Sequence, residues 1–132
     1  MADSLSLDNT LVSNLGIEIV ELSDEKIVAT MPVDERTQQP FGILHGGASV
    51  ALAETVASIG TFFLIDQENE NAVGLEINAN HLRAVRSGKV KAIGTTYHRG
   101  RNTMVWDIKI VDEEEKLVCI SRCTMAVIKR KK

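Results

Sequence analysis

The pattern of hydrophobic and polar positions divides the chain into segments with two different periods. Residues 46–65 are apolar or small at nearly every position, over a length that is typical of a helix and not of a strand. Elsewhere apolar residues alternate with polar ones over short stretches, as Trp106, Ile108 and Ile110 do within residues 102–111. Such alternation is typical of strands with one buried face. The pattern therefore predicts one long helix among several strands.

The predicted elements follow one another in the order strand, strand, long helix and four further strands. They are a short helix at 7–15, strands at 16–23 and 26–33, a loop at 34–45, the long helix at 46–65, a loop at 67–71, and strands at 72–85, 89–100, 102–111 and 116–129. Most connections between successive strands are short, so the strands are expected to pair antiparallel. We infer a single α+β domain over residues 1–132, in which one antiparallel sheet wraps around the long helix.

The long helix is apolar on nearly all of its sides, whereas one sheet covers only one side. A second copy of the chain would cover the rest, so the sequence predicts a homo-oligomer.

Composition and charge narrow the class of protein. The chain is 44% hydrophobic and 25% charged with a net charge of −3, so no broad basic surface for nucleic acid is expected. Residues 46–65 are long enough to span a membrane, but Glu54 at their centre would be costly in lipid, so no membrane association is predicted. The first ten residues lack the basic and apolar segments of a secretion signal. Cys119 and Cys123 would lie roughly 13 Å apart on one strand, too far for a disulfide. These features predict a cytoplasmic location.

Glu54 is the one ionisable carboxylate in the helical segment, and its position suggests chemistry. Its helix neighbours are small or apolar apart from one hydroxyl: Val50, Ala51, Ala57 and Ser58. Burial among them would make the carboxylate a stronger base. The alternative is a glutamate that reaches solvent or pairs with an arginine.

The sequence His45-Gly46-Gly47 precedes this helix. Glycines allow a ligand to approach the backbone, and the unpaired N–H groups of a helix N-terminus favour negative charge on an oxygen. These are the parts of an oxyanion site, although the same residues could simply begin a helix. Gly46 and Glu54 lie about 12 Å apart along one helix, so one carbonyl group cannot contact both. Two helices packed antiparallel across a two-fold axis would bring Glu54 of one chain to Gly46 of the other, which predicts composite sites in a dimer interface.

The stretch MPVDERTQQPFGILHGGASVALAETVAS, residues 31–58, resembles the hotdog-fold acyl-CoA thioesterases. It is most similar to the branch with the 1,4-dihydroxy-2-naphthoyl-CoA hydrolases and the enterobactin proofreading thioesterase. The resemblance continues through GLEINANHLRAVRSGKV, YHRGRNTMVWDIKIVDEE and CISRCTMAV, and covers about residues 10–128. HGGASVALAE preceded by QPFG is its most specific part. It implies the hotdog fold, and homodimers that assemble into homotetramers with active sites built from both subunits.

The resemblance also implies a role for each matched residue. Glu54 matches the catalytic carboxylate, acting as nucleophile or general base, and Gly46 matches the glycine whose N–H polarises the thioester carbonyl. The remaining candidates are His45 and Gln39, which position the thioester, Ser58, which helps to place water, and His81, which contacts the acyl group. Thr55, beside Glu54, is a further substrate-binding candidate. His81 is followed by Leu82 where some relatives carry a second histidine, which leaves the acyl specificity open.

Coenzyme A is part of the expected substrate, and no cofactor is predicted. Its phosphates could bind basic residues near the turns: Arg83, Arg86, Lys89, His98, Arg99 and Arg101. No metal site is expected, because the three histidines, at 45, 81 and 98, fall on different elements.

The sequence therefore predicts a thioesterase that cleaves an aromatic or bulky acyl-CoA, such as 1,4-dihydroxy-2-naphthoyl-CoA, to the free acid and CoA. Menaquinone biosynthesis is one pathway that would use it. The alternatives are a thioesterase for acyl or aryl carrier proteins, a non-catalytic acyl-CoA-binding protein, an inactive oligomerising scaffold, and a hydratase, which would need an Asp/His pair near the helix.

Overall fold

The protein is described by a computed structural model that covers residues 6–131. Residues 1–5, part of the segment used to predict that there is no secretion signal, and Lys132 lie outside the described residues. The elements are α1 (Leu11–Asn14), β1 (Glu18–Leu22), β2 (Ile27–Pro32), α2 (Gly46–Leu64), β3 (Glu70–His81), β4 (Lys89–Arg99), β5 (Thr103–Val111) and β6 (Leu117–Lys129). Their order is the predicted one.

One predicted strand, at 72–85, is placed differently from the expectation. It begins two residues earlier, at Glu70, and ends at His81. Residues 82–85 form a loop instead, which crosses toward the start of the long helix, since the N–H of Leu44 donates to the carbonyl of Val85 at 2.8 Å. Of these four residues only Val85 is buried, whereas Leu82, Arg83 and Ala84 are exposed, so one buried residue held beside the loop before α2 takes the place of the predicted strand end.

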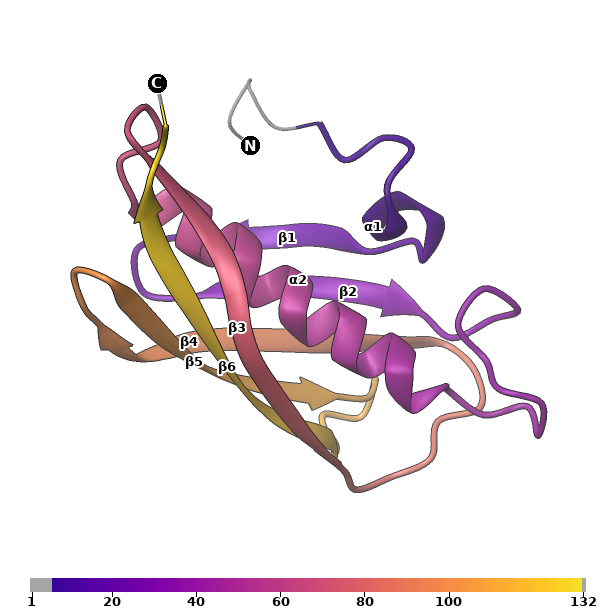
Figure 1. The fold of residues 1–132 in the computed structure, drawn as a ribbon. Helices are drawn as coiled ribbons and strands as arrows, with labels where there is room; N and C mark the ends of the chain where they lie inside the picture. The colour runs from indigo at the N-terminus through magenta and orange to yellow at the C-terminus, as the bar shows by residue number, and fades with distance from the viewer. Residues whose placement is uncertain (1–5, 132) are drawn as a thin grey trace.

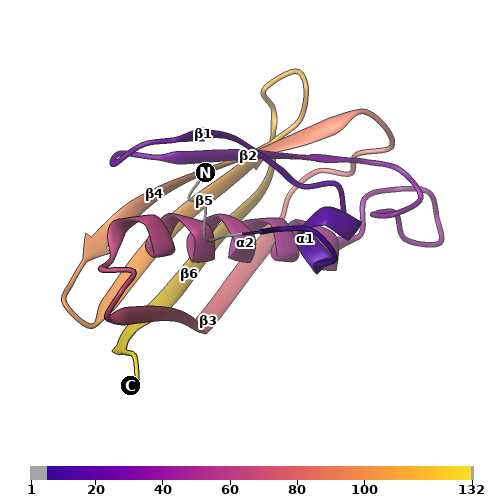
Figure 2. The same cartoon turned by 90° about the horizontal axis from the view of Figure 1, so that it is seen from above.

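The strands form one six-stranded antiparallel sheet in the order β1-β2-β4-β5-β6-β3. The sheet curves around α2, which runs along its concave face (Figures 1 and 2). Strand β3 lies at an edge and pairs with β6 on one side. The predicted α+β layout, with one antiparallel sheet around one long helix, is confirmed.

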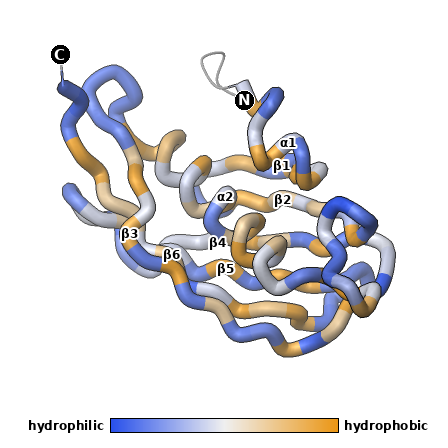
Figure 3. Tube along the Cα trace, turned by 45° about the vertical axis from the view of Figure 1, so that its right-hand side comes forward, coloured by the Kyte–Doolittle hydropathy of each residue, from blue (hydrophilic) through white to orange (hydrophobic). Residues whose placement is uncertain are grey.

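The core lies between α2 and the sheet, and glycines bring the two close together. Hydrophobic positions run along α2 and alternate with hydrophilic ones along the strands (Figure 3). Trp106 of β5 lies beneath the helix, where its indole N–H donates to the hydroxyl of Thr61 at 2.8 Å. A Cβ on Gly60 would lie only 2.5 Å from the Trp106 ring, so the indole occupies the space that a side chain would take.

The face of α2 that points away from the sheet is only partly covered in the single chain. Val50, Ala51, Thr55 and Ser58 are half-buried there, and Glu54 is exposed. The expectation that Glu54 is buried is therefore wrong for one chain, because its small neighbours are too short to cover it. By length and composition α2 could cross a membrane, but half of its most apolar window is buried in the fold, as in the core helix of a globular domain.

Candidate active site

The loop of residues 34–45 fixes the position of the N-terminus of α2. The N–H of His45 donates to the carbonyl of Thr37 at 2.8 Å, and that of Leu44 donates to Val85. Thr37 is buried. These backbone hydrogen bonds hold the loop against the body of the protein, so the first turn of the helix has a defined direction.

His45 is the N-cap of α2, and its side chain shapes the first turn. Its Nδ1 accepts a hydrogen bond from the N–H of Gly47 at 2.7 Å. Because an accepting nitrogen carries no proton, the neutral imidazole holds its proton on Nε2. The N–H of Gly46 has no partner among the described residues. It stands at a helix N-terminus, so it can donate to an incoming oxygen.

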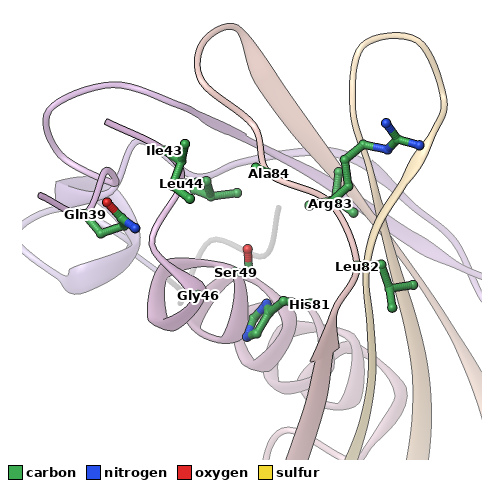
Figure 4. Close-up of a pocket in the computed structure, with 10 residues that line it drawn as sticks. Gln39, Ile43, Leu44, Gly46, Ser49, His81, Leu82, Arg83 and Ala84 are labelled. Atoms are coloured by element: carbon green, nitrogen blue, oxygen red, sulfur yellow. The ribbon is translucent and has the colours of Figure 1, made fainter. Parts of the chain in front are cut away.

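A cavity of about 430 Å³ lies beside Gly46 (Figure 4). The imidazole of His81 packs against Gly46 there, since a Cβ on that glycine would lie 2.9 Å from the His81 Nε2 atom. Gln39 also lines the cavity. Its side-chain oxygen accepts from the N–H of Phe41, so its amide nitrogen is the group left to donate to a ligand. The structure thus brings together three predicted residues, Gln39, Gly46 and His81, at one cavity.

Glu54 lies elsewhere in the single chain. It lines one cavity of about 210 Å³ with Gly74 and Cys123, and another of about 370 Å³ with Thr55 and Ser58. The cavity beside Gly46 does not include it. This agrees with the separation of Gly46 and Glu54 along the helix that the sequence predicted.

The carboxylate of Glu54 makes no hydrogen bond or ion pair with the described residues, so the alternative of an arginine partner is not found there. Strand β3 approaches it closely at Gly74, where a Cβ would lie 3.3 Å from Oε2. A register irregularity in β3 falls next to this contact, between Gly74 and Glu76. Burial, and then the charges of Glu54 and Glu76, raise the pKa of the Cys123 thiol to about 11, so this cysteine is neutral and unreactive.

The two hydroxyls near Glu54 differ in what they bind. Thr55 donates to the carbonyl of Ala51 at 2.7 Å, so its proton is used within the helix. The Ser58 oxygen lies 3.9 Å from the sulfur of Met125, a weak contact that a water could replace. Ser58 is therefore the better placed of the two to hold a water molecule beside Glu54.

The predicted phosphate-binding residues do not form one patch in the single chain. Arg83 lines the cavity beside Gly46, but its guanidinium points away from the glycine (Figure 4). Lys89 begins β4, whereas His98 lies near the other end of that strand and Arg101 lies in the turn that follows it. The strand has 11 residues, which separates the two groups by roughly 33 Å.

Two residues at these sites were not identified from the sequence. Gly74 had a usable signal, because an isolated glycine within a strand often marks a bulge or a close approach. Ser49, which lines the cavity beside Gly46, had none, since serine is common in helices. Among the described residues, no group of three or more His, Cys, Asp and Glu side chains is placed to hold a metal ion.

Comparison with known proteins gives consistent matches. Residues 41–119 match the family described as the thioesterase superfamily. The chain is 52% identical to the 1,4-dihydroxy-2-naphthoyl-CoA hydrolase of Listeria monocytogenes, covering 92% of this chain and 98% of that one. It is 49% identical to the proofreading thioesterase EntH of Cronobacter turicensis, covering 90% and 86%. A variant of thioesterase PA1618 from Pseudomonas aeruginosa has a similar structure, with a TM-score of 0.92 and 48% identity over 94% of this chain and 89% of that one.

Proposed function

This chain belongs to the thioesterase superfamily and is a thioester hydrolase with a hotdog fold, and we propose that it hydrolyses aromatic acyl-CoA thioesters. The observation that carries the proposal is the N–H of Gly46, which has no partner within residues 6–131 and stands at the start of α2 beside a cavity that Gln39 and His81 also line. A helix N-terminus stabilises the oxyanion that forms when a thioester carbonyl is attacked.

In the proposed mechanism, the thioester oxygen accepts from the N–H of Gly46, and the Gln39 amide and His45 Nε2–H orient the thioester. The carboxylate of Glu54 attacks the carbonyl carbon or takes a proton from the attacking water. If Glu54 attacks, the C–S bond breaks to leave an anhydride between the acyl group and Glu54, and water hydrolyses this anhydride to release the acid and restore the carboxylate. If water attacks, its oxygen bonds to the carbonyl carbon and the C–S bond breaks to give the acid directly. In both cases the departing thiolate takes up a proton. Because a thiolate leaves readily, no strong general acid is needed, and the proposal requires no cofactor.

We propose that Gly46 and Glu54 act together across a homodimer, with tetramers formed from two such dimers. The two groups face separate cavities in one chain, so a composite site needs a second copy. Strand β3 offers an edge beside Glu54, where Val73 and Leu75 are 42% and 60% exposed. An uncovered edge with apolar side chains favours pairing with another strand. Pairing there would place α2 of the partner alongside this helix.

The acyl group is the finer part of the proposal. Two of the similar proteins are named for 1,4-dihydroxy-2-naphthoyl-CoA hydrolysis and for proofreading, so we propose an aromatic acyl group, with menaquinone biosynthesis as one pathway. Thr55, Arg83, Lys89, His98 and Arg101 stay candidates for substrate contacts. A cytoplasmic location also stays a prediction.

Thiol release from acyl-CoA substrates tests the proposed function. The panel contains a naphthoyl, a benzoyl, a phenylacetyl and a medium-chain acyl-CoA. We expect the enzyme to hydrolyse each substrate whose acyl group fits the site, and to be fastest with an aromatic acyl group. Faster turnover of the medium-chain substrate would contradict the aromatic assignment. No turnover of any CoA substrate, with turnover of an aryl carrier protein, would favour the carrier-protein alternative.

Replacing Gly74 with alanine should lower kcat by roughly 3–10-fold with little change in KM, because the new Cβ would lie 3.3 Å from Glu54 Oε2 and would shift the carboxylate by a few tenths of an ångström. The backbone tolerates the change, since Gly74 is not among the positive-φ residues. Steady-state kinetics and urea unfolding check the prediction. Asn71→Ala, on the same strand but away from Glu54, is the control and should have normal kinetics. A Gly74→Ala protein with wild-type kcat would show that β3 does not position the carboxylate.

A further inference from the structure

Ser49 carries the only buried side-chain nitrogen or oxygen that lacks a hydrogen-bond partner among residues 6–131. The residue is 1% exposed and lies in the second turn of α2. A serine within a helix commonly donates to the carbonyl four residues earlier, but the Ser49 hydroxyl does not do so here. Leaving a buried hydroxyl unpaired costs stability, so a ligand that completes this hydrogen bond would remove the cost.

The hydroxyl faces the cavity beside Gly46 (Figure 4). Ser49 follows Gly46 by three residues, so both lie on one face of the helix, and helical side chains tilt toward the N-terminus. A thioester whose oxygen binds the Gly46 N–H would therefore have its nearest acyl atoms close to Ser49. Part of the cavity wall is apolar and includes Leu44 and Val118.

We propose that Ser49 is a specificity-determining residue that binds a hydroxyl substituent of the acyl group, located close to the thioester carbonyl. This inference rests on the proposed function. A hydroxyl is the fitting partner, because the Ser49 oxygen both donates and accepts, and the apolar walls pack against the rest of a ring. A charged substituent fits less well, since Arg83, the arginine that lines this cavity, is exposed and points away from Gly46. An unsubstituted ring would leave the Ser49 hydroxyl unpaired.

The test compares benzoyl-CoA with 2-hydroxybenzoyl-CoA and 4-hydroxybenzoyl-CoA. The wild type should prefer the 2-hydroxy substrate over benzoyl-CoA in kcat/KM, and Ser49→Ala should lower that ratio by about 10-fold. The 4-hydroxy to benzoyl ratio should change little, because that hydroxyl lies at the far end of the ring. An unchanged 2-hydroxy ratio in Ser49→Ala, no such preference in the wild type, or a loss confined to the 4-hydroxy substrate would each overturn the assignment. If the wild-type protein hydrolysed none of these three acyl-CoA substrates, the result would count against the proposed function itself and would remove the basis of this inference.

Thermal unfolding separates this role from a structural one. Ser121 is a matched buried serine whose hydroxyl donates to the carbonyl of Asn78 at 2.8 Å. Ser121→Ala should lower Tm, whereas Ser49→Ala should leave Tm unchanged or raise it, because no hydrogen bond is lost in the unliganded protein. A fall in Tm equal to that of Ser121→Ala would show that Ser49 has a structural partner and would overturn the proposal. If Ser49→Ala does not fold, the same two kcat/KM ratios can be measured in Ser49→Cys, whose side chain is similar in size and is a weaker hydrogen-bond donor. The 2-hydroxy to benzoyl ratio should again fall.

Discussion

Replacing Glu54 with alanine is expected to lower kcat for acyl-CoA hydrolysis by about 10²-fold or more, while the protein keeps its fold and its assembly. Glu54 is exposed in the single chain and makes no hydrogen bond or ion pair with the described residues, so its removal breaks no contact that stabilises the fold. What it removes is the carboxylate that starts the reaction. Thiol release and sedimentation of the same sample measure both parts of the expectation.

Two further variants make this result specific. Glu54→Gln keeps the size of the side chain and removes its charge, so it should be nearly as slow as Glu54→Ala. Glu76→Gln removes a carboxylate from the same cavity and should stay within about 3-fold of the wild type. Equal losses in the Glu54 and Glu76 variants would mean that the total charge of this cavity matters, and not a reacting group at Glu54. An active Glu54→Ala protein would refute the assigned role.

The sequence predicted the helix and the strands well because the patterns of hydrophobic residues in the two kinds of element differ clearly. Alternation along residues 102–111 and the continuous apolar run from Gly46 leave one interpretation each, and the structure confirms both. The end of β3 was predicted less well, since Val85 is buried beside a loop that is distant in sequence, while Leu82 and Ala84 are exposed. Hydrophobic periodicity reports burial, and it does not identify what covers a residue.

The same limit explains which parts of the site could be predicted. The spacing in the sequence was enough to predict that Gly46 and Glu54 lie far apart on one helix, and the structure places them at different cavities. Whether Glu54 is buried could not follow from its neighbours, because that depends on which face the sheet covers. Ser49 could not be found at all, since an unpaired hydroxyl is a property of the packed structure.

Gly46 is the residue whose replacement should have the other large effect. Gly46→Ala adds a Cβ that would lie 2.9 Å from the His81 Nε2 atom, at the point where a thioester oxygen would approach the N–H. We expect a loss of about 10²-fold in kcat. The backbone tolerates alanine, because Gly46 is helical and is not among the positive-φ residues, and alanine favours a helix. A folded, nearly inactive protein is therefore expected, which makes it suitable for testing whether the active site spans two chains.

Glu54→Ala and Gly46→Ala chains that are unfolded together and refolded as an equal mixture are expected to recover about a quarter of the wild-type activity per chain. If each site takes Gly46 from one chain and Glu54 from its partner, mixed dimers hold one site with both native residues and one site with neither. About half of randomly formed dimers are mixed, and about half of their sites are intact, which gives that fraction. Glu54→Ala refolded with Glu54→Gln is the control and should recover nothing, because every site then lacks the carboxylate. Activity no higher than that of the two parents, in a mixture that sediments as the wild type does, would place Gly46 and Glu54 of one site on the same chain and would refute the composite site.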